Sequence, residues 1–242
     1  MADHLPMLGI SSFCLHDLPL TAALETLRGL TNTVEIMDDG NHYLETAEPL
    51  ESYDLRFFLH APSRGVNIAS LREPIRRASV EVLSQCFGVA AEVGAPVIIH
   101  PGYFAWKEER EAALGQFRRS LGELKRAAAD LSVTFCVENM PAWDYFLLRF
   151  PGDVALLEGQ GLALDVGHAR LNGCLGEFLK LPLTHVHLHD NDGKNDSHAA
   201  VGKGSIDFGA VMRAVERDHA PAIVEVATLE GVLSSMVSLG KA

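Results

Sequence analysis

The sequence predicts an α/β protein that folds as a single (β/α)8 TIM barrel over residues 1–242. The chain of 242 residues has the length of an ordinary barrel of this kind, which takes about 250 residues. Eight short apolar runs, each as long as a buried parallel strand, alternate with longer segments of helical periodicity. No G-x-G-x-x-G or Walker-type glycine motif follows the first run, which disfavours a doubly wound open sheet, the alternative fold.

Each of the eight runs is rich in Val, Ile, Leu or Phe, and we expect each to form one strand. In chain order they are Met7–Ile10, Thr33–Met37, Arg56–His60, Pro96–His100, Thr134–Glu138, Leu162–Asp165, Thr184–His189 and Ala222–Val226. No low-complexity or Pro/Ser-rich linker separates any of them. The sequence therefore predicts one domain.

Helices are predicted from apolar spacing and from residues that favour helix ends. The helix candidates are Leu20–Leu30, Pro74–Val93, Lys107–Asp130, Asp207–Arg217 and Thr228–Leu239. The second begins with proline and is followed by Gly94, which suits a helix start and a helix stop. The fourth begins with an aspartate that can cap it. Residues 38–55 show no regular period, so no full helix is expected there.

Composition and charge limit the class of protein. The chain is 48% hydrophobic and has 20 Lys+Arg against 32 Asp+Glu, for a formal charge of -12. This acidic balance disfavours nucleic acid as the main partner, because phosphate binding depends on Lys and Arg. Met1–Pro6 shows no secretory signal, and no apolar stretch approaches the roughly 20 residues of a membrane span. Four scattered cysteines suggest reduced thiols. We expect a cytoplasmic protein, with its oligomeric state left open.

Acidic and histidine residues occur at or near the ends of six successive predicted strands. They are His60, His100, Glu138, Asp165, His187 and Glu225. In a barrel these ends meet at one mouth, where active sites lie. A single histidine there is more often a hydrogen-bonded core residue. Several carboxylates converging with no Lys or Arg at any strand end would repel one another, and a divalent cation resolves that conflict.

The seventh run and the loop after it hold further candidates. His185, His187 and His189 share one strand face, so at most one or two can reach one metal, and another can contact substrate. Two loops offer chelating turns, Asp165-Val166-Gly167-His168 and Asp196-Ser197-His198. Asp190, Asp192 and Asn195 are expected to form an exposed polar turn. Gly202-Lys203-Gly204 is too short for a phosphate loop, although its amides can approach an anion. Lys203 and His189 are the substrate-binding candidates.

An ordered series of short motifs resembles the xylose isomerase-like superfamily of TIM barrels, which includes the endonuclease IV family and sugar isomerases and epimerases. The resemblance covers almost the whole chain. The motifs are Phe58-Leu59-His60, Ile99-His100-Pro101-Gly102, Val137-Glu138-Asn139, Leu164-Asp165-Val166-Gly167-His168, His187-Leu188-His189-Asp190, Asp196-Ser197-His198 and Glu225. Each motif is weak alone, and the series in this order is specific.

The resemblance implies a set of metal ligands. In endonuclease IV-like enzymes nine ligands hold three zinc ions, which here would be bound by His60, His100 and Glu138; by Glu138, Asp165, His187 and Glu225; and by His168, Asp196 and His198. In the isomerase and epimerase branch one zinc, manganese or magnesium ion is held by residues matching Glu138, Asp165, His187 and Glu225. There Glu138 and Glu225 also serve as the acid/base pair.

The two branches imply different chemistry. Three metals suit phosphodiester hydrolysis, and one metal suits proton transfer beside a carbonyl. We expect a metal-dependent isomerase or epimerase acting on a sugar or sugar phosphate, with catalytic Glu138 and Glu225 and one to three divalent ions, zinc most favoured. The alternative is a phosphoesterase with a trinuclear zinc site. A third interpretation is a metal-stabilised barrel that binds a sugar without turnover. The charge and the short loops, with few basic residues (Arg64, Lys107, Arg149 and Arg170), disfavour DNA.

Overall fold

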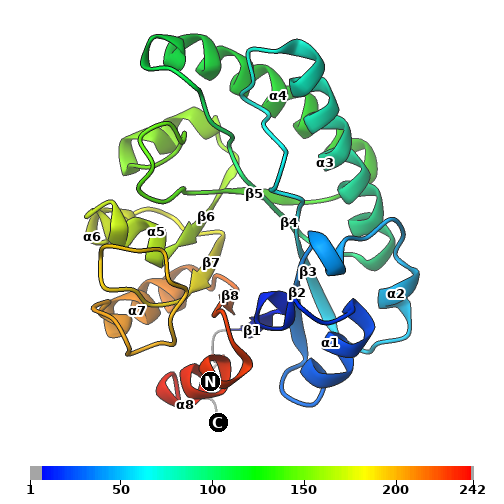
Figure 1. Ribbon diagram of the computed structural model, residues 1–242, viewed down its shortest axis with the longest axis vertical. Helices are drawn as coiled ribbons and strands as arrows, with labels where there is room; N and C mark the ends of the chain where they lie inside the picture. Colours follow the sequence, from blue (N-terminus) through cyan, green and yellow to red (C-terminus); the bar gives the residue numbers. More distant parts are fainter. Residues whose placement is uncertain (1–6, 241–242) are drawn as a thin grey trace.

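The computed structural model describes residues 7–240, in which eight parallel strands close into a barrel in the order of the sequence (Figure 1). The strands are β1 (Leu8–Ser11), β2 (Thr33–Met37), β3 (Arg56–His60), β4 (Val97–Ile99), β5 (Phe135–Glu138), β6 (Gly161–Asp165), β7 (His185–Leu188) and β8 (Ala222–Val224). Each strand overlaps the run predicted for it, so the predicted fold class is confirmed. Residues 1–6, on which the expectation of no secretory signal depends, lie outside the described residues.

Helices of very unequal length connect the strands. They are α1 (Leu20–Leu27), α2 (Glu48–Glu51), α3 (Glu73–Val93), α4 (Arg110–Leu131), α5 (Val166–Leu171), α6 (Leu175–Phe178), α7 (Phe208–Asp218) and α8 (Leu229–Ser238). The long helices α3 and α4 pack side by side along one side of the barrel (Figure 1). The first three residues of the helix predicted over Lys107–Asp130 form a 3-10 turn, Lys107–Glu109, and the α-helix α4 follows from Arg110.

The ends of the helices follow the residues that predicted them. The α3 helix stops where Gly94 takes up a left-handed conformation with a φ of 65°. The Asp207 carboxylate caps α7 by accepting a hydrogen bond from the amide of Ala210. The irregular segment between β2 and β3 has one 3-10 turn and the four-residue α2. Between β5 and β6 the chain forms only a 3-10 helix, Pro151–Leu157, which leaves a long loop at the mouth.

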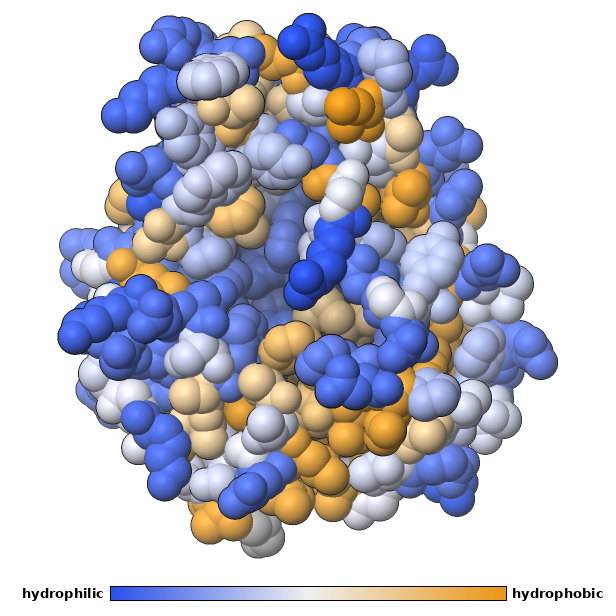
Figure 2. All heavy atoms as spheres, viewed as in Figure 1, coloured by the Kyte–Doolittle hydropathy of each residue, from blue (hydrophilic) through white to orange (hydrophobic). Residues whose placement is uncertain are grey.

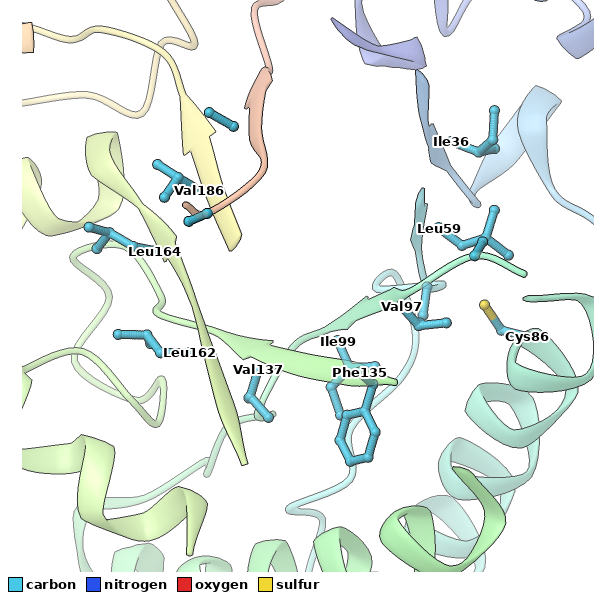
Figure 3. Close-up of a cluster of buried hydrophobic side chains, with 14 of the residues drawn as sticks. Ile36, Leu59, Cys86, Val97, Ile99, Phe135, Val137, Leu162, Leu164 and Val186 are labelled. Atoms are coloured by element: carbon cyan, nitrogen blue, oxygen red, sulfur yellow. The ribbon is translucent and has the colours of Figure 1, made fainter. Parts of the chain in front are cut away.

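Strand alternation divides the apolar residues into two layers. Outward side chains such as Leu59, Val97 and Val137 pack beneath the helices in the larger cluster (Figure 3). The inward apolar residues form a small cluster inside the barrel: Phe58, Ile98, Cys136, Ala163 and Ile223. Because side chains two residues apart share a face, the next inward residue on these strands lies at the mouth. The barrel thereby holds its polar residues directly above an apolar floor.

The four cysteines are buried and form no disulfide. Within residues 7–240 no helix combines the length and the apolar character that crossing a membrane requires.

Candidate metal centre

All nine predicted metal ligands lie together at the carboxyl ends of the strands. Their nitrogen and oxygen atoms form three groups, in each of which the donor atoms lie within 4.8 Å of one another. A cavity of about 670 Å³ opens above them and is lined by seven of the nine: His60, His100, Glu138, His168, Asp196, His198 and Glu225. The surface is hollowed near the centre of the face shown in Figure 2, and the residues in the hollow are hydrophilic.

The first group is centred on the Glu138 carboxylate. Its Oε2 atom lies 3.1 Å from Nε2 of His60 and 3.0 Å from Nε2 of His100. Its other oxygen, Oε1, lies 3.3 Å from Nδ1 of His187. One carboxylate at the end of β5 therefore faces two groups of ligands, as a residue bridging two metal ions would.

The second group surrounds Nδ1 of His187. This nitrogen lies 3.3 Å from Glu138, 3.4 Å from Glu225 and 3.9 Å from Asp165. All four residues are buried. Burial alone lowers the pKa of His187, but the surrounding carboxylates raise it well above its usual value. Three carboxylates and one imidazole nitrogen directed at one point are a suitable ligand set for a divalent cation.

The third group lies where the loop after β7 returns to the mouth. Asp196 Oδ2 is 3.1 Å from Nε2 of His168 and 3.6 Å from Nε2 of His198. The His189 ring stacks on the His198 ring with 3.9 Å between their centroids. Nε2 of His189 lies 2.9 Å from Oδ1 of Asp165, so it connects the third group to the second.

Histidine orientation tests whether these residues fit a metal. In three of them Nδ1 lies at hydrogen-bond distance from a backbone carbonyl oxygen: His60 at 3.1 Å from Ala61, His168 at 2.8 Å from Asn139 and His198 at 2.9 Å from Glu225. A donating Nδ1 leaves the Nε2 lone pair facing a carboxylate, which is repulsive unless a proton or a cation lies between them.

The pKa values of these three histidines express the same conflict. Burial lowers each of them, but the facing carboxylates raise the pKa of His60 to about 9, of His168 to about 10 and of His198 to about 9. A divalent cation relieves the repulsion without a second proton on each ring. The orientation of the rings and the chemistry of the donors therefore fit bound divalent ions.

Glu35 is a buried carboxylate that was not among the predicted site residues. It points into the barrel from β2, with Oε1 2.9 Å from Nε2 of His187 and Oε2 2.7 Å from Nε2 of His185. Glu35 therefore holds the far side of the His187 ring while Nδ1 faces the metal groups. Glu35 is also the acidic partner of His185, which lies deeper in the barrel than the mouth. A single acidic residue inside the apolar run Thr33–Met37 was the signal that could have identified it.

The two predicted substrate-binding side chains do not line the cavity. His189 is fully buried against Asp165. Lys203 is exposed on the loop after β7. His189 also belongs, with His168, Asp196 and His198, to one of the groups of side chains that could hold a metal ion. Lys203 lies outside the cavity wall.

The expectation that Asp190 belongs to an exposed turn is wrong, although Asp192 and Asn195 are exposed as predicted. Asp190 is only 1% exposed. Its two carboxylate oxygens accept hydrogen bonds from five backbone amides, those of Asn191, Gly202, Gly204, Ser205 and Ile206. Backbone donors converge on this carboxylate because the loop turns back on itself, which spacing along the sequence does not reveal. Asp190 thus fixes the loop that carries Asp196 and His198.

Gly167 allows the closest approach between two parts of the site. It lies in the turn between Asp165 and His168, with the imidazole ring of His189 packed directly over its Cα, so that an added Cβ would overlap the ring. The chelating turn and the buried histidine therefore fit together only because residue 167 has no side chain.

A closed parallel barrel whose mouth gathers histidines and carboxylates in groups that could hold a metal ion is the class of protein that these observations define. Residues 29–235 match the family model described as a xylose isomerase-like TIM barrel, and the chain belongs to this family. It is 36% identical to the uncharacterized protein MJ1614 of Methanocaldococcus jannaschii over 230 residues, which cover 90% of this chain and 91% of that protein.

Two other relatives represent the two branches named above. A probable endonuclease 4 of Mycobacterium leprae is 30% identical over 199 residues, covering 75% of this chain and 77% of that protein. The crystal structure of a D-tagatose 3-epimerase-like protein superposes with a TM-score of 0.89 at 27% identity, covering 97% of this chain and 96% of that one. The barrel is thus similar to proteins from both branches.

Proposed function

We propose that this protein is a metal-dependent enzyme that isomerises or epimerises a sugar by moving a proton at a hydroxy-carbonyl group. The observation that carries the proposal is the placement of Glu138 and Glu225. Both carboxylates belong to the same ligand group and both line the cavity. Two carboxylates facing one cavity supply a base that removes a proton and an acid that returns it.

Glu138, Asp165, His187 and Glu225 would hold the ion that this reaction uses. Mixed imidazole and carboxylate ligands suit zinc and also manganese. When bound, the cation polarises the carbonyl and hydroxyl oxygens of the sugar, which acidifies the carbon-bound proton between them. The remaining ligands (His60, His100, His168, Asp196 and His198) would hold further ions or contact substrate.

The protein residues perform the other parts of the reaction. Glu225 and Glu138 exchange the proton with the substrate carbon from the cavity wall, and their burial keeps bulk water away from the reacting carbon. His187 is held by Glu35 on its far side, so its Nδ1 atom keeps a fixed direction. Similarity to the D-tagatose 3-epimerase-like protein supports this assignment.

A phosphoesterase with a trinuclear zinc site is the second candidate. The completeness of the three ligand groups favours it, as does similarity to the probable endonuclease 4. The composition of the cavity wall argues against it, because Arg64 is the single Lys or Arg among the described residues that line the cavity. Binding of a DNA backbone requires several cationic contacts.

Solvent deuterium exchange separates the two candidates. The zinc-loaded or manganese-loaded protein is incubated in D2O with a panel of ketoses, aldoses and their phosphates, and carbon-bound deuterium is measured by NMR. We expect exchange into at least one sugar, lost in both Glu138→Gln and Glu225→Gln and kept in Asp192→Asn, an exposed control on the neighbouring loop. Incision of abasic-site DNA that depends on Glu138, without exchange into any sugar, would overturn the proposal.

Metal stoichiometry adds an independent measurement. Elemental analysis of protein purified without chelator is expected to give about one tightly bound divalent ion per chain for an epimerase. A ratio near three supports the phosphoesterase, and absence of bound metal under any loading condition contradicts both.

A further inference from the structure

A cluster of aromatic side chains forms one wall of the cavity beside the metal ligands. We call Tyr103, Trp143 and Phe146 the aromatic wall. Their ring centroids lie 5.6 Å apart between Tyr103 and Trp143, and 4.8 Å apart between Trp143 and Phe146. All three line the same cavity as Glu138 and Glu225. Tyr103 is 38% exposed and Trp143 is 44% exposed, so two large rings are accessible at the mouth.

The backbone holds this wall in place. The loop after β4 pairs with the loop after β5: the amide of Phe104 donates to the carbonyl of Tyr145, and the amide of Leu147 donates to the carbonyl of Gly102. Gly102 has a φ of 88°, a conformation that favours glycine. An apolar surface that is exposed yet ordered before a ligand arrives is typical of a preorganised binding site.

Asn67, in the loop after β3, links that loop to the aromatic wall by hydrogen bonds. Its side-chain amide donates to the carbonyl oxygen of Tyr103 at 2.9 Å and accepts from the amide of Tyr103 at 3.1 Å. Asn67 is itself only 7% exposed. Two bonds to one residue fix the direction in which the Tyr103 backbone presents its ring.

The size and the charge of the cavity limit what the wall can bind. At about 30 Å³ for each water-sized heavy atom, the twelve heavy atoms of a hexose fill at most about 360 Å³, whereas the cavity has about 670 Å³. A monosaccharide held at the metal ligands therefore leaves room for another ring. Arg64 is the one Lys or Arg among the described lining residues, so this room does not suit a group of several negative charges.

We propose that the aromatic wall is a subsite for an uncharged flat ring, so that the substrate is an aryl glycoside whose sugar unit carries a keto group on its ring and lies at the metal ligands, while the aryl ring stacks on Trp143 and Tyr103. This inference rests on the proposed function for the position of the sugar unit. Rings stack well on indole and phenol faces because both partners are flat and polarisable. The apolar wall and the hydrophilic ligand groups then bind opposite ends of one molecule.

Paired sugar derivatives test the subsite. The probes are the phenyl and methyl β-glycosides of D-glucose, D-galactose and D-xylose, titrated into the zinc-loaded protein by calorimetry. For at least one sugar, the phenyl glycoside is expected to bind about tenfold more tightly than the methyl glycoside. Trp143→Ala is expected to remove this difference. Trp106→Ala, a control at a tryptophan that is 66% exposed and outside the cavity, is expected to keep it.

Fluorescence gives a second readout, which does not depend on turnover. The chain has two tryptophans, so Trp106→Phe leaves Trp143 as the only indole. The emission of this variant is expected to shift with phenyl glycosides and to remain constant with methyl glycosides. A phenyl preference that survives Trp143→Ala, equal affinity within every pair, or absence of binding by every pair would overturn the subsite.

Failure of the subsite is distinguishable from failure of the proposed function. Deuterium exchange without any phenyl preference contradicts the subsite alone. A phenyl preference that Trp143→Ala abolishes, in a protein that exchanges no deuterium into any sugar or glycoside, supports the subsite and contradicts the proposed reaction. Binding of D-glucose 6-phosphate that is tighter than that of every phenyl glycoside, and that Arg64→Ala removes, would replace the uncharged ring with a phosphate and overturn the inference.

Discussion

The contact between Glu35 and His187 makes a measurable prediction about metal affinity. Glu35 Oε1 lies 2.9 Å from Nε2 of His187, and the opposite ring nitrogen faces Glu138 and Glu225. Both Glu35 and His187 are fully buried. The negative charge beside Nε2 of His187 favours a proton on that nitrogen and makes the opposite nitrogen more basic toward a cation. Glu35→Gln keeps the shape of the side chain and removes its charge.

The magnitude follows from the number of contacts that the substitution changes. Loss of a partner on the far side of a metal-binding histidine lowers metal affinity by about 10-fold to 100-fold. The glutamine oxygen can still accept from one of the two rings, so we expect a value near the lower limit. A tenfold weaker zinc affinity corresponds to about 1.4 kcal/mol.

Competition with a chromogenic chelator measures this affinity directly. His185→Gln is the matched control, because it changes the other ring beside Glu35, at 2.7 Å, and leaves the contact with His187 in place. We expect Glu35→Gln to bind zinc about tenfold more weakly than the unmodified protein and His185→Gln to bind it nearly as tightly. Equal affinities in Glu35→Gln and the unmodified protein, or an equal loss in both variants, would refute the positioning argument.

Three further predictions concern the supports of the site. Asp190→Asn replaces an acceptor of five backbone amides with a group that can accept through one atom only. It should lower the free energy of unfolding by about 3 kcal/mol in urea titrations. A change below about 0.5 kcal/mol would contradict a stabilising role for these five hydrogen bonds. Gly167→Ala places a methyl group against the His189 ring, and should reduce the amount of bound zinc in elemental analysis, while Gly176→Ala, where a Cβ meets no neighbour, should not. Asp38 is 1% exposed, and burial raises its pKa to about 7. The folded state therefore binds more protons than the unfolded state between about pH 4 and 7, so this group stabilises the protein at low pH and the contribution falls by about 1.4 kcal/mol per pH unit as the pH rises through that window. Relative to Asp38→Asn, which does not titrate, the unmodified protein should lose stability between pH 5 and 7, and a constant difference in the free energy of unfolding would contradict this pKa.

The barrel and the ligand set were accessible from sequence because both depend on local periodicity. A buried parallel strand reads as a short apolar run, and its last inward residue points to the mouth whatever its neighbours are. His60, Glu138 and Asp165 could be located by this rule alone. Their assignment to particular metal groups came from the family resemblance, and the structure brings the same residues within reach of one another.

Other features depend on pairing between distant segments, which periodicity does not encode. Glu35 is coupled to His185 and His187 only because β2 and β7 face each other across the barrel. Asp190 is buried because the loop folds its own amides around it. The aromatic wall exists because backbone hydrogen bonds join the loops after β4 and β5. In each case the residue type was visible in the sequence and its partner was not.

The acidic charge at the mouth bears both on metal binding and on the preference of the aromatic wall for an uncharged ring. Glu138, Asp165, Asp196 and Glu225 concentrate negative charge at the mouth, which attracts cations and repels anionic substrates before a metal binds. Divalent ions bound there reverse this field locally. With Arg64 as the one Lys or Arg among the described lining residues, the charge in the cavity depends on metal occupancy. We therefore expect metal to bind first and an uncharged glycoside second, and glycoside affinity should fall when EDTA removes the metal.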